Sequence, residues 1–471
     1  MSTVAVLRPA SDEECGVSPA AVRYAAEQLS VRAGVSHEEF CRWHVDFSEP
    51  GYVDLYVQPG TRKRLRFPRM GLRTWGRIEE GVFHTSTAQW PMGNSGCKLT
   101  RDFKIPFSSS GETAVGPLFV RQTSDCFRCP VDLLSSIVLS LVRFEETLPT
   151  PRDIHGRFTA YASVAWRDGF LQRPVVDEYG MAFEQVLKVL LPGWKPVERV
   201  LRVKLSHDVD EIGIPFSFRS AVAKTVRHGH PLLTLLDLAA PLLSLDNSDR
   251  LHLKRLVQLS LTHGLDSALY WKTSRQGPYD TGYDLDDRRI RRLIHTIEQA
   301  GVEMGIHPSY ETFLSPVQLH DEVEKLRALF GSIKLGGRQH YLRWDPQSWA
   351  RWDAIGLAYD SSVGFADYVG FRAGTCIPYR PWLWSENCCA GLVEIPLLAT
   401  DSTLRGYMKL SASQALAVLR SLVDRCREVG GVFTLAWHNT ALLDSRYSET
   451  YRLLLEDLTG SPKFEWRTAA A

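Results

Sequence analysis

Residues 201–211, LRVKLSHDVDE, join an apolar run to a polar tip. The apolar side chains alternate as far as Leu205, which predicts a buried strand. The polar tip holds His207, Asp208 and Asp210. In parallel α/β folds, and above all in β/α barrels, reactive groups gather at the carboxyl ends of the strands. Two carboxylates at such a tip can divide the work, one as a metal ligand and the other as a base.

Two more predicted strands, both in the second half of the chain, end in a histidine. Residues 302–306 lead to His307, and residues 432–437 lead to His438. Helical patterns lie between the strands, at residues 286–300, 315–330 and 412–429. Strands that alternate with helices in this way predict a β/α barrel or an open parallel sheet.

The residue types at these three tips are typical of a metal site. A single histidine at a strand end is more often a hydrogen-bonded structural residue, but three tips that share one placement favour a functional site. Asp and His together suit zinc or a similar divalent ion, which polarises a carbonyl group and activates water. A second carboxylate can take the proton from that water, and a histidine across the site can give one to a leaving amine.

The first 195 residues have a different pattern. They predict a helix at 20–31, alternating strands at 52–57 and 64–68, and another helix at 131–146. The turn-rich segment Pro192–Pro196 then interrupts the pattern before the central strand. We therefore predict a smaller α+β domain at residues 1–195, of unknown role, and a β/α domain at 196–471.

The composition is that of an ordinary globular protein. Lys and Arg number 55 against 54 Asp and Glu, so a nucleic-acid partner is not expected. No basic segment followed by an apolar one opens the chain, which predicts a cytoplasmic location. The apolar residues 230–245 are shorter than the ~20 residues of a membrane span. They predict a packed helical insertion rather than a transmembrane segment, with contact to a membrane surface as the alternative.

At the residues of these strand tips the chain resembles the polysaccharide deacetylases, carbohydrate esterases of the chitooligosaccharide and peptidoglycan deacetylase type. The resemblance covers about residues 201–460. The first motif of that family is matched by residues 206–210, SHDVD, which implies that Asp208 is the base and Asp210 a metal ligand. The family fold implies a distorted barrel of about seven or eight β/α units, here preceded by the smaller N-terminal domain.

The second motif of the family holds two metal-binding histidines, the second of them four residues after the first. It is matched by residues 307–311, HPSYE, so that Glu311 stands where the second histidine is expected. The resemblance therefore implies a ligand set of Asp210, His307 and Glu311, since a carboxylate is a competent zinc ligand. Two alternatives stay open: Glu311 faces solvent and His340 or His207 completes the set, or no metal binds.

The remaining motifs imply further roles. Arg338 would orient the base, and His438 would be the acid. The implied substrate-binding residues are His340, Tyr310, Tyr341, Trp344 and Trp437, with core packing as the alternative for the aromatic side chains. Segments similar to a subgroup with a leading N-terminal domain are residues 143–146, 153–157, 280–283 and 371–375.

The resemblance implies a metal-dependent hydrolase that removes an N-acetyl group from an amino sugar in a glycan, a glycoconjugate or a glycosylated metabolite. Zn²⁺ is the favoured cofactor, and Co²⁺, Ni²⁺ and Mn²⁺ are alternatives. The alternative function is a non-catalytic carbohydrate-binding or scaffold protein on the same barrel. The joint presence of Asp208, Arg338 and His438 favours catalysis, because a binding module needs neither an acid nor a base.

Overall fold

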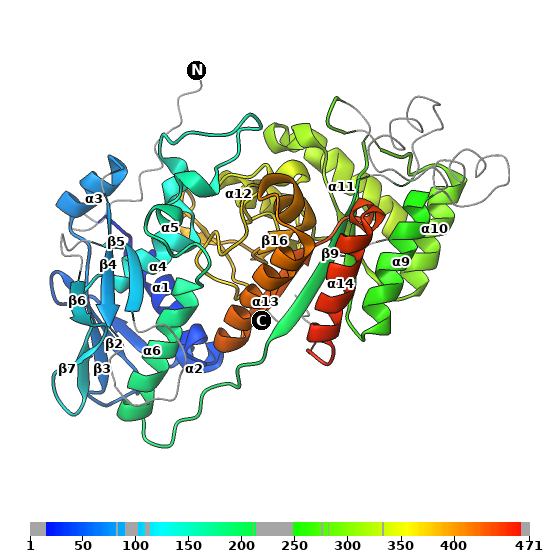
Figure 1. Cartoon of the computed structure of the whole chain (residues 1–471). Helices are drawn as coiled ribbons and strands as arrows, with labels where there is room; N and C mark the ends of the chain where they lie inside the picture. The colour runs from blue at the N-terminus through cyan, green and yellow to red at the C-terminus, as the bar shows by residue number, and fades with distance from the viewer. Residues whose placement is uncertain are drawn as a thin grey trace.

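The computed structural model describes residues 16–81, 83–89, 102–108, 114–210, 212, 248–274, 277–280, 282–331 and 334–462. Helices and strands mix in the first part and alternate in the second, so the predicted mixed α/β class is confirmed. Figure 1 shows the N-terminal elements, coloured blue to cyan, on one side of the C-terminal elements. The apolar residues 230–245 lie outside the described residues, and the idea of a surface contact there stays a prediction.

The N-terminal region combines two sheets with helices. The larger sheet has the strand order β1-β2-β3-β8-β7 and the smaller one β5-β4-β6. Its strands are β1 (His44–Asp46), β2 (Tyr52–Tyr56), β3 (Arg64–Pro68), β4 (His84–Gln89), β5 (Asp102–Ser108), β6 (Ala114–Pro117), β7 (Val120–Arg121) and β8 (Cys126–Arg128). Its helical segments are α1 (Pro19–Arg32), α2 (His37–Cys41), α3 (Leu72–Glu79), α4 (Leu133–Leu141), η1 (Phe144–Thr147), η2 (Ala160–Ala162), α5 (Val164–Arg167) and α6 (Val175–Leu190).

Parallel strands form the centre of the C-terminal region, with β9 (Arg202–Val209) in the middle. β9 pairs with β17 (Val432–Ala436) on one edge and with β10 (Ser267–Trp271) on the other. β10 also pairs with β11 (Glu303–Ile306), and β17 with β16 (Ala399–Thr400). Because all these pairs are parallel, the carboxyl ends of the strands meet at one rim. β9, β11 and β17 coincide with the strands predicted at 201–205, 302–306 and 432–437.

A second parallel pair continues this array. β12 (Tyr359–Asp360) pairs with β15 (Val393–Glu394), and Gly337 bridges to β11 on one side and β12 on the other. Residues 393–400 therefore bond to β12 at their start and to β17 at their end. A Cβ atom at Gly337 would lie 1.9 Å from the carbonyl oxygen of Ile306, so this close pairing requires glycine. A separate antiparallel hairpin consists of β13 (Trp382–Leu383) and β14 (Cys388–Cys389).

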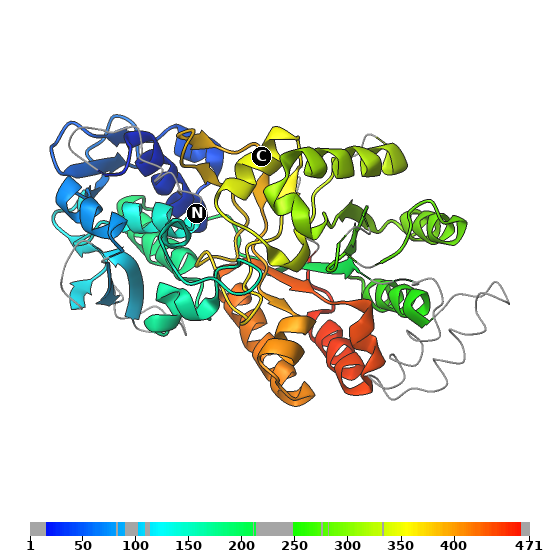
Figure 2. The same cartoon turned by 90° about the horizontal axis from the view of Figure 1, so that it is seen from above.

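Helices surround the parallel strands, as the view in Figure 2 shows. They are α9 (Ser248–Thr262), α10 (Arg288–Gln299), η3 (Tyr310–Leu314), α11 (Pro316–Phe330), η4 (His340–Leu342), α12 (Gln347–Ala354), η5 (Thr403–Tyr407), α13 (Ala412–Val429), η6 (Asn439–Leu443) and α14 (Ser445–Leu458). α13 has clear end signals, because Ser411 and Gln414 form a capping box and Gly430 ends the helix in the left-handed conformation. No helix in the described part of the chain combines the length and apolarity needed to cross a bilayer.

Buried ion pairs join the two regions. Glu146 in η1 accepts a hydrogen bond of 2.9 Å from Arg372 Nε. Asp177 of α6 pairs with Arg32 at 2.8 Å, and the Thr375 hydroxyl donates to the same carboxylate. All five side chains are buried. Two segments singled out in the sequence, residues 143–146 and 371–375, therefore meet at the contact between the regions.

Candidate metal centre and active site

Asp208 lies at the carboxyl end of β9, where a buried arginine holds it. Arg338 Nη1 donates to Asp208 Oδ1 at 2.8 Å, and the same guanidinium donates to Ser206 and Ser361. Only 5% of Asp208 and 0% of Arg338 is exposed. Burial would raise the pKa of Asp208, but the effects of Arg338, followed by His307 and His438, together outweigh burial and keep the pKa below its usual value. Asp208 is therefore an ionised carboxylate at the rim of the strands, as a base requires.

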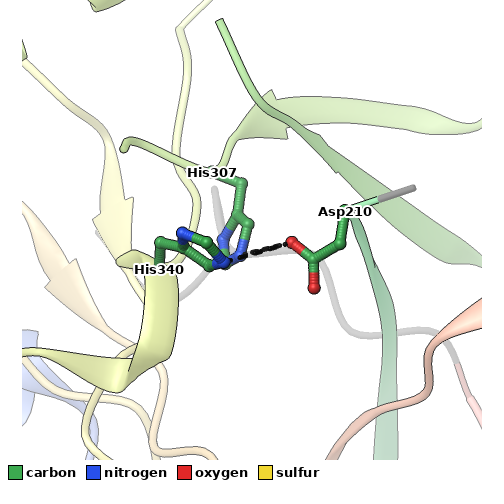
Figure 3. Close-up of side chains that lie close together, drawn as sticks. All are labelled: Asp210, His307 and His340. Carbon is green, nitrogen blue, oxygen red and sulfur yellow. Dashed lines mark ion pairs between the residues drawn. The ribbon is translucent and has the colours of Figure 1, made fainter. Parts of the chain in front are cut away.

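Three side chains from different segments of the chain converge on one point, as Figure 3 shows. Asp210 follows β9, His307 follows β11, and His340 lies in η4. Asp210 Oδ1 is 3.4 Å from His307 Nε2 and 3.5 Å from His340 Nε2. Candidate ligand atoms of the three residues all lie within 4.8 Å of one another. Asp210 Oδ1 is buried and accepts no hydrogen bond from the described residues, so it is an orphaned acceptor at this point.

Hydrogen bonds behind the two imidazoles fix their orientation. His307 Nδ1 lies 2.6 Å from the carbonyl oxygen of Arg338, to which only an N–H can donate. His340 Nδ1 lies 2.7 Å from Asp280 Oδ1, and burial lowers the pKa of His340, which favours its neutral form. A neutral imidazole with its proton on Nδ1 carries its lone pair on Nε2, the atom that faces Asp210 in both rings. A carbonyl or carboxylate behind each ring is typical of metal-binding histidines.

The spacing of these atoms fits a tetrahedral divalent metal ion. Bonds of ~2.0–2.1 Å at tetrahedral angles place neighbouring ligand atoms about 3.4 Å apart. The measured distances from Asp210 Oδ1 to the two Nε2 atoms are 3.4 and 3.5 Å. Three protein ligands of this kind leave one position open for water or substrate, as in catalytic zinc sites. The residues present therefore fit a metal ion of the class that the sequence predicts.

His438 follows β17 and points its Nε2 toward both aspartates of β9. The distance is 3.6 Å to Asp210 Oδ2 and 4.0 Å to Asp208 Oδ2. On the other side of the ring, Nδ1 lies 2.6 Å from Asp401 Oδ1, which also accepts the backbone amide of His438. Burial by itself would lower the pKa of His438, but Asp401, followed by Asp210 and Asp208, raises it to about 10. His438 therefore holds a proton on the nitrogen that faces the site, as an acid requires.

A cavity of about 300 Å³ opens onto these groups. Its size lies at the lower end of the ~300–1,000 Å³ of small-ligand pockets. Lys272, directly after β10, contributes a buried ammonium group whose Nζ lies 3.5 Å from Asp280 Oδ1. The lining residues are Arg157, Asp208, Asp210, Lys272, Tyr279, His307, Gln339, His340, Tyr341, Leu342, Ala366, Thr400, Ser402, Thr403, Tyr407 and His438.

Glu311 and His207 do not join the cluster. Glu311 is exposed in η3, between the buried Tyr310 and Thr312, because the segment after His307 is an extended turn and a 3₁₀ helix that direct residue 311 outward. His207 points to the face of β9 opposite Asp208, since successive side chains of a strand alternate. Its Nδ1 lies 2.7 Å from the carbonyl oxygen of Trp437. The third member of the cluster is therefore His340 and not Glu311, the residue that the motif spacing favours.

The aromatic residues expected to contact a sugar fall into two groups. Tyr341 lines the cavity, and Tyr310 stands behind it with a distance of 5.4 Å between the ring centroids. Trp344 and Trp437 are buried and each packs against another aromatic ring. Neither tryptophan is among the described residues that line the cavity. The two tryptophans therefore follow the core-packing alternative.

Lys272, Asp280 and Arg157 belong to this site, but the sequence patterns assign them no role. Lys272 directly follows β10, so the strand-end rule that selects Asp208 and His307 would also select Lys272. Asp280, which contacts His340, and Arg157, which lines the cavity, come from loops, where no pattern marks a functional side chain. Their only signal is that they belong to segments 280–283 and 153–157, which resemble a subgroup of the family.

The N-terminal region matches the model of a family of unknown function (DUF7033) over residues 79–192. A search of curated proteins finds no match. The match to this family therefore assigns no activity to the N-terminal region.

Solved structures similar to this chain carry the name polysaccharide deacetylase, the family that the strand-tip motifs resemble. One from Mycobacterium smegmatis is 15% identical, covers 57% of this chain and 87% of that chain, and has a TM-score of 0.39. One from Pseudomonas aeruginosa PAO1 is 14% identical, with coverages of 57% and 88% and a TM-score of 0.38. A third, from Bordetella bronchiseptica and named for O-antigen biosynthesis, is 15% identical, with coverages of 57% and 88% and a TM-score of 0.28. At these values the likenesses fix no residue of the site, and the side-chain roles rest on the geometry above.

Proposed function

We propose that this protein is a metal-dependent N-deacetylase that acts on an amino sugar. The observation that carries the proposal is the arrangement around Asp210. Three candidate metal ligands, Asp210, His307 and His340, share one cavity with a carboxylate held by Arg338 and an imidazole held by Asp401. A non-catalytic carbohydrate-binding module would need neither a base that a buried arginine keeps ionised nor an acid that an aspartate keeps protonated.

We assign the metal to Asp210, His307 and His340, with Zn²⁺ as the favoured ion because one carboxylate and two imidazoles suit its coordination. A bound Zn²⁺ would polarise the acetyl carbonyl group and lower the pKa of a water molecule beside it. Asp208 takes a proton from the attacking water, because Arg338 keeps its carboxylate ionised and oriented. His438 gives its Nε2 proton to the amine as the C–N bond breaks, and the products are acetate and a free amino sugar.

The cavity walls support a sugar substrate. Tyr279, Tyr341 and Tyr407 line the cavity, and their rings can pack against the apolar faces of a sugar while their hydroxyl groups stay near polar atoms. An N-acetylated hexosamine presents both such a face and the amide that the proposed chemistry cleaves. We therefore favour an amino-sugar glycan, glycoconjugate or glycosylated metabolite as the substrate.

We also propose that the parallel strands close into a distorted β/α barrel at residues 196–471, after a separate domain at 1–195. The pairing of residues 393–400 with β12 at one end and β17 at the other supports closure. The chain between α6 and β9 contains no helix or strand, which supports the boundary.

Metal content is the first test, because it needs no knowledge of the substrate. The protein is dialysed against Zn²⁺ and then against metal-free buffer, and the bound metal is measured by inductively coupled plasma mass spectrometry. We expect about one ion per chain, and none in Asp210→Ala, because three protein ligands hold a single ion. Absence of bound metal in the unmodified protein would favour the non-catalytic alternative.

Acetate release is the second test. Metal-loaded protein is incubated with N-acetylglucosamine, its oligosaccharides and its nucleotide diphosphate conjugate, and acetate is measured enzymatically. We expect release from at least one of these probes and none with Asp208→Asn, which keeps the metal ligands but removes the base. Equal release by the two proteins would refute the proposed mechanism.

A further inference from the structure

A loop of the N-terminal region, residues 153–157, reaches the wall of the cavity. Arg157 lines the cavity and is buried, although it comes from a different region than the metal-binding cluster. Its Nη1 donates to the backbone oxygen of Tyr341 at 2.9 Å, and its Nη2 donates to the Tyr407 hydroxyl at 2.8 Å. The backbone to which Arg157 hydrogen-bonds therefore directly follows His340.

The turn that Arg157 contacts has a strained backbone. Tyr341 has φ 59° and ψ 11°, and Leu342 has φ 54°, so two successive residues other than glycine lie in the left-handed region. Such a conformation persists only where the surroundings hold it in place, and it is enriched at functional sites. Because His340 directly precedes these residues, the aim of its imidazole depends on this turn.

The loop has hydrogen bonds within itself, and it contacts the turn through both His155 and Arg157. Asp153 accepts the backbone amides of His155 and Arg157, each at 2.9 Å, and pairs with the Arg157 side chain at 2.7 Å. The His155 ring packs against Tyr341 with a distance of 4.7 Å between the ring centroids. Arg343, which follows the turn, donates back to the carbonyl oxygen of His155 at 3.2 Å. The loop and the turn therefore stabilise each other, with hydrogen bonds donated in both directions.

We propose that residues 153–157 are a positioning element of the metal centre. The loop holds the left-handed turn at Tyr341 and Leu342, and thereby aims His340 Nε2 at the metal-binding point. This inference rests on the proposed metal site and assigns a role to part of the region that matches the family of unknown function. Arg157 and His155 act through His340 and are positioning residues.

The N-terminal and C-terminal regions are also joined by contacts other than those between the loop and the turn. The buried contacts of Arg372 with Glu146 and of Arg32 with Asp177 lie elsewhere in the interface. Loss of Arg157 should therefore leave the regions joined and the chain folded. It should weaken metal binding, because disturbing a group that orients a metal ligand typically lowers metal affinity by about 10- to 100-fold.

The test compares zinc affinity in four full-length variants with that of the unmodified protein, measured by competition with a chromogenic chelator. Arg157→Ala should lower the affinity by about 10- to 100-fold, with an unchanged thermal unfolding midpoint. Arg167→Ala is the matched control, since Arg167 is an arginine of the same region that pairs with an aspartate, Asp168, at the surface. The third protein is His340→Ala, and the fourth combines His340→Ala with Arg157→Ala. If Arg157 acts through His340, the double variant should bind zinc no more weakly than His340→Ala, because the two losses are not additive.

The outcomes separate this inference from the proposed function. Zinc binding by the unmodified protein with unchanged affinity in Arg157→Ala would overturn the inference alone, as would full additivity in the double variant. No zinc binding by the unmodified protein would overturn the proposed function and the inference with it. If Arg157→Ala does not fold, His155→Ala replaces it, because this change removes the ring that packs on Tyr341 and keeps the Arg157 side chain. Unchanged zinc affinity in a folded His155→Ala would then overturn the inference.

Discussion

The two sides of the cavity hold their polar groups in different ways. On the acid–base side each reactive group already has a close partner within the chain: Arg338 lies 2.8 Å from Asp208, and Asp401 lies 2.6 Å from His438. On the metal side Asp210 Oδ1 faces two imidazole nitrogens and accepts no hydrogen bond from the described residues. Partners within the chain hold the reactive groups of the first side, whereas the second side presents one carboxylate oxygen and two imidazole nitrogens to the point that we assign to the metal ion. Substitutions on the two sides should therefore have separable effects.

Asp208→Asn should have the largest effect on turnover. Loss of the base should lower the rate of acetate release by about 10²–10⁴-fold, while bound metal stays near the level of the unmodified protein, because the cluster is untouched. Asn can still accept a hydrogen bond from Arg338, and circular dichroism checks that the fold is kept. Loss of bound metal together with activity would show that the acid–base side and the metal side of the cavity are not separable.

Asp280→Asn should weaken zinc binding, an effect of intermediate size among these predictions. The amide oxygen can still accept from His340 Nδ1, but the negative charge that increases the basicity of the imidazole is lost. Zinc affinity should fall by about 10- to 100-fold. Asp286→Asn, an exposed aspartate that pairs with Arg291, is the matched control and should bind zinc normally. Equal affinities for the two variants would show that Asp280 does not support the ligand.

Asp401→Asn should change the pH dependence rather than the metal content. Asp401 is a main cause of the raised pKa of His438, so its loss should lower that pKa. An acid is active while protonated, and activity is lost as the pH rises through its pKa. The alkaline limb of kcat against pH should therefore move to lower pH, with normal zinc content. An unmoved limb would show that His438 is not the acid or that Asp401 does not control its protonation.

Glu311→Ala should have the smallest effect. Glu311 is exposed and lies outside the cluster, so zinc affinity should stay within about twofold of the unmodified protein. The measurement is the same chelator competition. A drop of tenfold or more would restore Glu311 as a ligand and remove His340 from that role.

Local sequence patterns were sufficient for the parts of the site that lie directly at strand ends. Asp208, Asp210, His307 and His438 all follow or end strands whose buried side chains the sequence marks. For these residues, recognition of the strand also gives the position of the tip, because parallel strands present their carboxyl ends at one rim.

The remaining parts of the site depend on contacts between distant segments. His340 reaches the cluster through a turn in which Tyr341 and Leu342 have positive φ, and neither residue type marks such a conformation. Asp280 lies in a loop and meets His340 across 60 positions of the chain. Arg157 meets Tyr341 across 184 positions. Periodicity within one segment carries no information about contacts between distant segments. The spacing within the second motif therefore favoured Glu311, which is near His307 in the sequence, over His340.

The central place of β9 has a consequence for biosynthesis. One edge of β9 pairs with β17, so this edge has no permanent partner until residues 432–436 have left the ribosome. The N-terminal region is synthesised first and can fold while that edge is still open. Premature termination before β17 would therefore release a chain with an exposed, apolar strand edge and without His438. Such fragments should aggregate rather than accumulate as partly active protein.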